Sequence, residues 1–252
     1  MSELVRDGVS IYYEERGQGN SIFLTHGFVA TGDMWFGQAE MLTRSHRLIT
    51  WDMRGHGRTS SPELQAKYSE AETVADMVAI MDAAGVEEAI VGGHSLGGYM
   101  ALAFHFAHPK RVSALILQDT GPGYKNPGTR EQWNGTARER ALDFENRGLA
   151  AMGKSGETLI ANHRSPIGIG RAARGMLAQF DARIINSLPD IAVPTLIIVG
   201  ENDTPYLAGS AYMEKKIPRA RQVVISDAGH AANIDQPTAW EKAVGEFLAE
   251  LG

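Results

Sequence analysis

The stretch AIVGGHSLGGYMALAFHFA, residues 89–107, joins a short apolar run typical of a strand to an apolar helical pattern. Between them stands a Gly-His-Ser-Leu-Gly motif centred on Ser95, which predicts a strained strand-to-helix turn. The flanking residues must be small there because a Cβ would collide with neighbouring backbone. Such a turn lifts the Ser95 hydroxyl above a sheet and aims the Leu96 N–H, at the positive end of the helix, toward a developing oxyanion. Ser95 is therefore a candidate nucleophile and Leu96 a candidate oxyanion donor, with a Gly-rich connection that has no chemical role as the plainer alternative.

Apolar strand candidates alternate with helical stretches on both sides of this motif. An Asp7-Gly8 pair, suited to the positive φ of a tight turn, predicts a hairpin between strands at 4–6 and 9–13. Short continuous apolar strands alternating with helices indicate a mostly parallel sheet with helices on both faces, an α/β fold with eight strands in all. The other six predicted strands are Ser21–Thr25, Leu48–Trp51, Ala89–Gly92, Ala114–Gln118, Thr195–Val199 and Gln222–Ile225. The predicted helices cover about 33–44, 70–84, 97–107, 206–216 and 237–250.

The alternation stops between Gly121 and Asp190. This segment has a mainly helical pattern, no convincing strand, and turn-rich sequences at both ends. We expect a helical cap at 121–190, inserted into a core made of residues 1–120 and 191–252. The cap is predicted to lie over the carboxyl edge of the sheet, where functional groups of parallel sheets gather.

A serine needs a base, and the base needs an acid to orient it. His230 follows the last predicted strand, so its loop falls at the same sheet edge as Ser95. Asp203 follows the strand before it, although an Asp just before a proline is also a common helix N-cap. Asp119 and Glu201 are rival acids. The order Ser95, Asp203, His230 is the one that a strand-to-helix nucleophile turn produces.

The composition narrows the classes of function. With 43% hydrophobic and 21% charged residues in 252, the chain has an ordinary globular balance. It has no cysteine, which excludes disulfides and thiol chemistry, and no apolar run approaching the roughly 20 residues of a membrane span. A net charge of −6 argues against a nucleic-acid partner. We expect a cytoplasmic protein, monomeric or homodimeric, that needs no metal or other cofactor.

Several motifs together resemble the α/β-hydrolase fold family over essentially the full chain. They are the serine motif, Thr25-His26-Gly27-Phe28, the loop at 52–60 (DMRGHGRTS), and the ending at 229–237 (GHAANIDQP). The resemblance implies that the Phe28 N–H is a second oxyanion donor. It also implies that His26, Arg54 and His56 shape loops.

The ending is similar to that of small capped esterases and lactonases, including the 3-oxoadipate enol-lactonase type. Ser95, in place of Asp, disfavours branches that attack through a carboxylate, and Ala231 stands where carbon–carbon hydrolases often carry Trp. The resemblance thus implies a serine hydrolase that cleaves carboxylic esters or lactones through an acyl-enzyme. A carbon–carbon hydrolase, an acyltransferase, a perhydrolase or a ligand receptor with vestigial hydrolysis are the alternatives.

Substrate selection is expected to lie with the cap. Candidate pocket residues are Trp35, Tyr124, Trp133, Met152 and Tyr206, although such aromatics are often simply core. The cap carries a net +3 while the whole chain is −6, which leaves −9 on the core. A basic cap could favour anionic substrates, but solvated helix faces explain the charges more simply.

Overall fold

The computed structural model describes residues 2–252, and they form an eight-stranded sheet in the order β1-β2-β4-β3-β5-β6-β7-β8. The β1–β2 and β2–β4 pairs are antiparallel, and every other pair is parallel. This confirms the predicted mostly parallel α/β sheet. The strands are β1 (Ser2–Arg6), β2 (Val9–Gly17), β3 (Asn20–Thr25), β4 (His46–Trp51), β5 (Ala89–His94), β6 (Val112–Gln118), β7 (Thr195–Gly200) and β8 (Ala220–Ile225).

The hairpin between β1 and β2 turns at the predicted pair, with φ of 50° at Asp7 and 76° at Gly8. The strands extend further than their apolar runs indicated. The last strand, for example, begins at Ala220 rather than Gln222. Paired backbone continues past the apolar residues because ladder hydrogen bonds do not require an apolar side chain.

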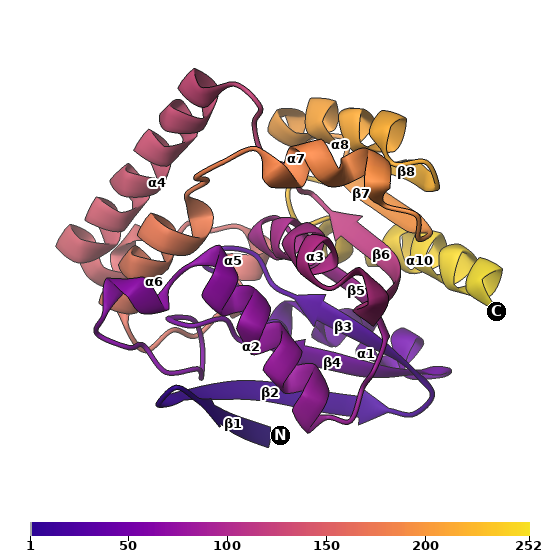
Figure 1. Cartoon of the computed structure of the whole chain (residues 1–252), viewed down its shortest axis with the longest axis horizontal. Coiled ribbons are helices and arrows are strands. Elements are labelled where there is room, and N and C mark those ends of the chain that lie inside the picture. The colour runs from indigo at the N-terminus through magenta and orange to yellow at the C-terminus, as the bar shows by residue number, and fades with distance from the viewer. Residues whose placement is uncertain (1) are drawn as a thin grey trace.

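Helices cover both faces of the sheet (Figure 1). One core packs α2, α3 and α8 against the sheet through residues such as Met77, Phe104 and Met213. The other packs α1 and α10 through residues such as Leu42 and Trp240, with Trp35 just before α1. The helices are α1 (Phe36–Leu42), α2 (Glu70–Ala83), α3 (Leu96–Ala107), α4 (Pro127–Arg147), α5 (Gly156–Ile160), α6 (Pro166–Ala172), α7 (Arg183–Ser187), α8 (Thr204–Lys216), α9 (Ala232–Asp235) and α10 (Pro237–Leu251).

The chain between β6 and β7 is helical and contains no strand, as its sequence pattern indicated. Its long helix α4 stands at one end of the molecule with α6 beside it (Figure 1). The last helix of this segment, α7, packs against α3 and joins the first core. None of the helices within residues 2–252 is long and apolar enough to cross a membrane.

Candidate active site

Ser95 occupies the turn between β5 and α3 with φ 51° and ψ −116°, a conformation that costs a non-glycine residue free energy. Two bonds fix it: its N–H donates to the Gln118 carbonyl (2.9 Å), and its carbonyl accepts from Thr120 Oγ1 (2.6 Å). A Cβ on Gly97 would collide with the Thr25 carbonyl oxygen. The glycines of the motif are therefore required by close backbone approach, as predicted.

His230 and Asp203 meet at the carboxyl edge of the sheet. The Nδ1–H of His230 donates to Asp203 Oδ2 at 2.8 Å, and Asp203 is only 5% exposed. Burial by itself lowers the pKa of His230, but the hydrogen bond and charge of Asp203 outweigh it, so the net shift is upward. Because the proton is held on Nδ1, the Nε2 lone pair of His230 is left to accept a proton.

Two aromatic rings connect His230 to the serine turn. The rings of His94 and Tyr206 each lie 4.8 Å from the His230 ring, centroid to centroid. His94 directly precedes Ser95 in the chain, and its Nε2–H donates to the His230 carbonyl at 2.5 Å. The Tyr206 hydroxyl lies beside the Ser95 side chain. No direct hydrogen bond joins Ser95 Oγ to His230 within the described residues, a separation common in sites without substrate.

Burial keeps His94 neutral by lowering its pKa well below the usual value. Because its Nε2 carries the proton that binds the His230 carbonyl, its Nδ1 is bare. His94 was not among the residues singled out from the sequence. Its position beside the serine was the only available signal, since no sequence motif predicts a hydrogen bond to a loop more than a hundred residues away.

The Leu96 and Phe28 N–H groups have no hydrogen-bond acceptor among residues 2–252. Leu96 begins α3, where the first N–H groups of a helix lack intrahelical partners. The Phe28 loop lies directly beside the serine turn. The backbone approach is so close that a Cβ added to Gly27 would collide with His94 Nδ1. The two N–H groups predicted as oxyanion donors are thus both free next to the turn.

Ser95 and Leu96 line a cavity of about 270 Å³. Three of the five residues expected to contact substrate also line it: Tyr124 and Trp133 from the β6–β7 segment, and Tyr206 from α8. Its remaining wall is formed largely by glycine, proline and apolar side chains. Within the described chain, no Lys, Arg, His, Asp or Glu contributes to its lining.

Trp35 and Met152 do not line this cavity. Trp35 is 1% exposed and packs against Trp240 on the other face of the sheet, so the interpretation of Trp35 as a pocket residue is wrong. Met152 is half-buried and packs with Phe28 against a small cluster around Phe144. In both cases a large apolar side chain fills a core, which sequence alone did not separate from a pocket wall.

The family model described as the alpha/beta hydrolase fold matches residues 20–153. The chain belongs to the α/β-hydrolase fold family. A Bacillus subtilis (strain 168) protein named as a 2-succinyl-6-hydroxy-2,4-cyclohexadiene-1-carboxylate synthase is 32% identical, covering 98% of this chain and 97% of that protein. The 3-oxoadipate enol-lactonase 1 of Acinetobacter baylyi is 28% identical, covering 92% and 87%. The solved structure of a thermophilic esterase from Thermogutta terrifontis has a TM-score of 0.86 at 26% identity, covering 100% and 99%.

Two buried histidines of this α/β hydrolase, His26 and His163, hold loops together. His26 donates from Nδ1–H to the Gly27 carbonyl (2.7 Å) and accepts the Met53 N–H on Nε2 (2.9 Å). His163, from the β6–β7 segment, donates to the Val29 carbonyl (2.9 Å) and accepts the Gly57 N–H (3.0 Å). Each ring uses one nitrogen as donor and the other as acceptor, an arrangement open only to neutral histidine. No sequence pattern pointed to His163.

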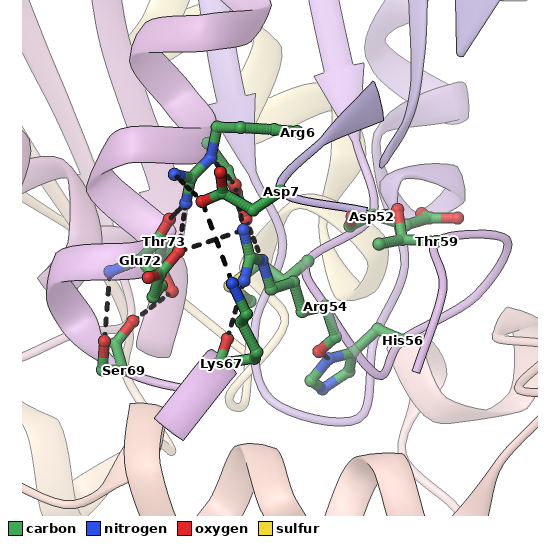
Figure 2. Close-up of polar contacts among 12 residues, drawn as sticks. Arg6, Asp7, Asp52, Arg54, His56, Thr59, Lys67, Ser69, Glu72 and Thr73 are labelled. Carbon is green, nitrogen blue, oxygen red and sulfur yellow. Dashed lines mark hydrogen bonds and ion pairs between the residues drawn. The ribbon is translucent and has the colours of Figure 1, made fainter. Parts of the chain in front are cut away.

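Arg54 belongs to an ion-pair network rather than to the cavity (Figure 2). Its buried guanidinium donates to both Asp76 oxygens, from Nε at 2.6 Å and from Nη2 at 2.8 Å, and from Nη1 to the Lys67 carbonyl at 3.1 Å. Arg6 of β1 binds the same carboxylate at 2.6 Å. Arg54 therefore fixes its loop to β1 and α2, in line with the loop-shaping role implied by the resemblance.

Residues 2–252 contain no group of three His, Cys, Asp or Glu side chains arranged to hold a metal ion.

Proposed function

We propose that this α/β hydrolase is a serine hydrolase that cleaves carboxylic esters or lactones. In this proposal Ser95 is the nucleophile, His230 the general base, and Asp203 the acid that orients it. The observation that carries the proposal is the His230–Asp203 hydrogen bond. It lies near the strained serine turn, because the rings of His94 and Tyr206 connect His230 to that turn. The enol-lactonase and esterase names of two relatives support the same choice.

Each step of the cycle has a group to perform it. Ser95 Oγ attacks the carbonyl carbon while His230 Nε2 takes the hydroxyl proton, and the oxyanion receives hydrogen bonds from the Phe28 and Leu96 N–H groups. The carbonyl then re-forms, the bond to the leaving oxygen breaks, and His230 returns the proton to that oxygen. In a lactone the released hydroxyl stays attached to the acyl group.

The second half repeats the proton transfers with water. His230 removes a proton from water as its oxygen attacks the acyl carbon, and the bond to Ser95 Oγ breaks as Oγ regains a proton. Each oxyanion donor is worth about 10²–10³ in rate in comparable sites. Asp203 keeps the imidazole in the required tautomer and stabilises its charged form.

We further propose that residues 121–190 act as a cap over this site, on a core of 1–120 and 191–252. This proposal is supported by the residues that line the cavity. Tyr124 and Trp133 belong to this segment and line the same cavity as Ser95. Every Lys and Arg of the segment is at least partly exposed, and none lines the cavity. The positive charge of the cap is therefore better explained by solvated helix faces than by selection of anionic substrates.

The Ser95→Ala variant tests the function. It should lower kcat/KM for a p-nitrophenyl alkanoate by about 10⁴-fold or more without changing the fold, and it should abolish labelling by a fluorophosphonate. Ser113→Ala, the same substitution at an exposed site on β6, is the matched control and should behave as wild type. Full turnover by Ser95→Ala would show that Ser95 is not the nucleophile.

A further inference from the structure

The cavity has largely apolar walls, and one buried side-chain oxygen in its described lining has no hydrogen-bond partner. The carboxamide of Gln179 lies at its lining, and its Oε1 is buried without a hydrogen bond. Its Nε2 also has no acceptor within residues 2–252. Three other polar side chains of the lining donate hydrogen bonds: Tyr99 to Glu70, Thr120 to the Ser95 carbonyl, and Trp133 to the Leu177 carbonyl. Buried polar groups are nearly always paired, so an exception in a cavity calls for an explanation.

Gln179 is held rigidly by its own backbone. Its N–H donates to Asn134 Oδ1 at 2.8 Å, and Asn134 Nδ2 donates back to the Gln179 carbonyl at 2.8 Å. With the Trp133–Leu177 bond at 2.7 Å, these contacts attach residues 177–179 to α4. The side chain therefore starts from a fixed backbone position, and no backbone freedom has to be lost there when a ligand binds.

The facing loop is shaped to admit this carboxamide. Gly123 has a φ of 88°, and a Cβ added there would lie 2.8 Å from Gln179 Oε1 and 3.4 Å from the Tyr99 ring. Any larger residue at this position would displace the amide. The loop that carries Gly123 belongs to the same wall as Thr120 and Tyr124, close to the serine turn.

We propose that Gln179 determines substrate specificity by hydrogen-bonding an uncharged amide-like group on the substrate; this rests on the proposed ester or lactone hydrolysis. An amide offers an N–H to Oε1 and a carbonyl to Nε2, so it satisfies either end of the Gln179 side chain. A carboxylate or ammonium group would enter a cavity whose described lining has no opposite charge, and burial of an unpaired charge is strongly unfavourable. The preferred substrate is thus a neutral ester or lactone with an apolar body and an amide.

The test compares two ester series in wild type and in Gln179→Leu. One series is p-nitrophenyl esters of N-acetylated ω-amino acids of increasing chain length, and the other is p-nitrophenyl alkanoates of matched length. The quantity measured is the ratio of kcat/KM for amide and alkyl esters, compared between the two proteins so that intrinsic ester reactivity cancels. Gln132→Leu, the same change at an exposed site on α4, is the control.

At the chain length that places the amide beside Gln179, Gln179→Leu should lower this ratio about tenfold. Part of the change should be faster turnover of the alkyl ester, because leucine leaves no buried polar group unpaired. Gln132→Leu should keep the wild-type ratio. A ratio unchanged by Gln179→Leu at every length would overturn the inference, while Ser95-dependent turnover of both series would leave the proposed function standing.

Binding separates the two proposals if wild type hydrolyses neither series. In that case the proposed function fails, and calorimetric Kd values for the same compounds decide the role of Gln179. A Kd preference for amide over alkyl compounds that falls about tenfold in Gln179→Leu supports the inference, and equal preference in both proteins overturns it.

Discussion

His26 has to remain uncharged for the Phe28 loop to keep its position, and this makes the stability of the protein sensitive to mild acid. Burial lowers the pKa of His26 to about 4, against 6.5 for an exposed histidine. Protonation would place an N–H on Nε2, directly against the Met53 N–H that it now accepts. We therefore expect acidification to weaken the folded state through this ring.

The size of the effect follows from proton linkage. At pH 5, the unfolded state binds a proton at residue 26 almost fully, whereas the folded state with its pKa of about 4 binds one only rarely. Because the unfolded state binds more protons, the free energy of unfolding falls as the pH drops below 6.5 and keeps falling until about pH 4. Between pH 7 and pH 5 the loss from His26 alone is about 2 kcal/mol. The lowered pKa values of His56, His94 and His163 act in the same direction.

Urea unfolding of wild type and His26→Gln, followed between about pH 8 and pH 5, measures this contribution. Glutamine does not titrate, so the variant should lose about 2 kcal/mol less than wild type over that range, whatever its stability at pH 8. The difference between the two slopes is the relevant quantity, because it removes any direct cost of the substitution. Parallel pH dependences in the two proteins would refute the reasoning.

Two further changes probe the site and the core separately. Asp203→Asn should lower kcat by about 10⁴-fold. It should also move the acidic limb of the kcat/KM profile to lower pH, because activity requires neutral His230 and Asp203 is what raises the His230 pKa; an unmoved limb would argue against this pairing. Trp35→Ala, which empties a core position against Trp240, should cost about 3–5 kcal/mol in urea unfolding. KM of its folded fraction should stay at the wild-type value, and a raised KM would return Trp35 to the substrate site.

The sequence was most informative where local physics allows few solutions. The Gly-His-Ser-Leu-Gly motif, after an apolar strand and before a helix, predicted a strained turn, and Ser95 has the positive φ of 51° that such a turn requires. The Asp7-Gly8 hairpin and the parallel strands were predictable for similar reasons, since turn chemistry and apolar runs are local properties.

Contacts between distant segments were not predictable in this way. Three sets of hydrogen bonds join residues far apart in the chain. They are the bond from His94 to the His230 carbonyl, the loop contacts of His163, and the bonds between Asn134 and the Gln179 backbone. A lone histidine or glutamine carries no periodicity or spacing that identifies its partner. Trp35 illustrates the converse error: its size and apolar character suit a pocket and a core equally well.

The sequence favoured Asp203 as the acid, and the structure shows how its role differs from that of Asp119, a rival that also follows a parallel strand at this edge. Both carboxylate oxygens of Asp119 accept hydrogen bonds from backbone groups: Oδ1 from the Gly200 N–H at 2.8 Å and Oδ2 from the Ala232 N–H at 3.1 Å. Burial raises its pKa to about 7 in spite of these bonds, so near neutral pH it is a poor source of fixed negative charge. Asp203 instead directs Oδ2 at the imidazole of His230. Asp119 thus links the end of β7 at Gly200 to Ala232, just after the His230 loop, and Asp203 is the acid that the proposed function assigns to His230.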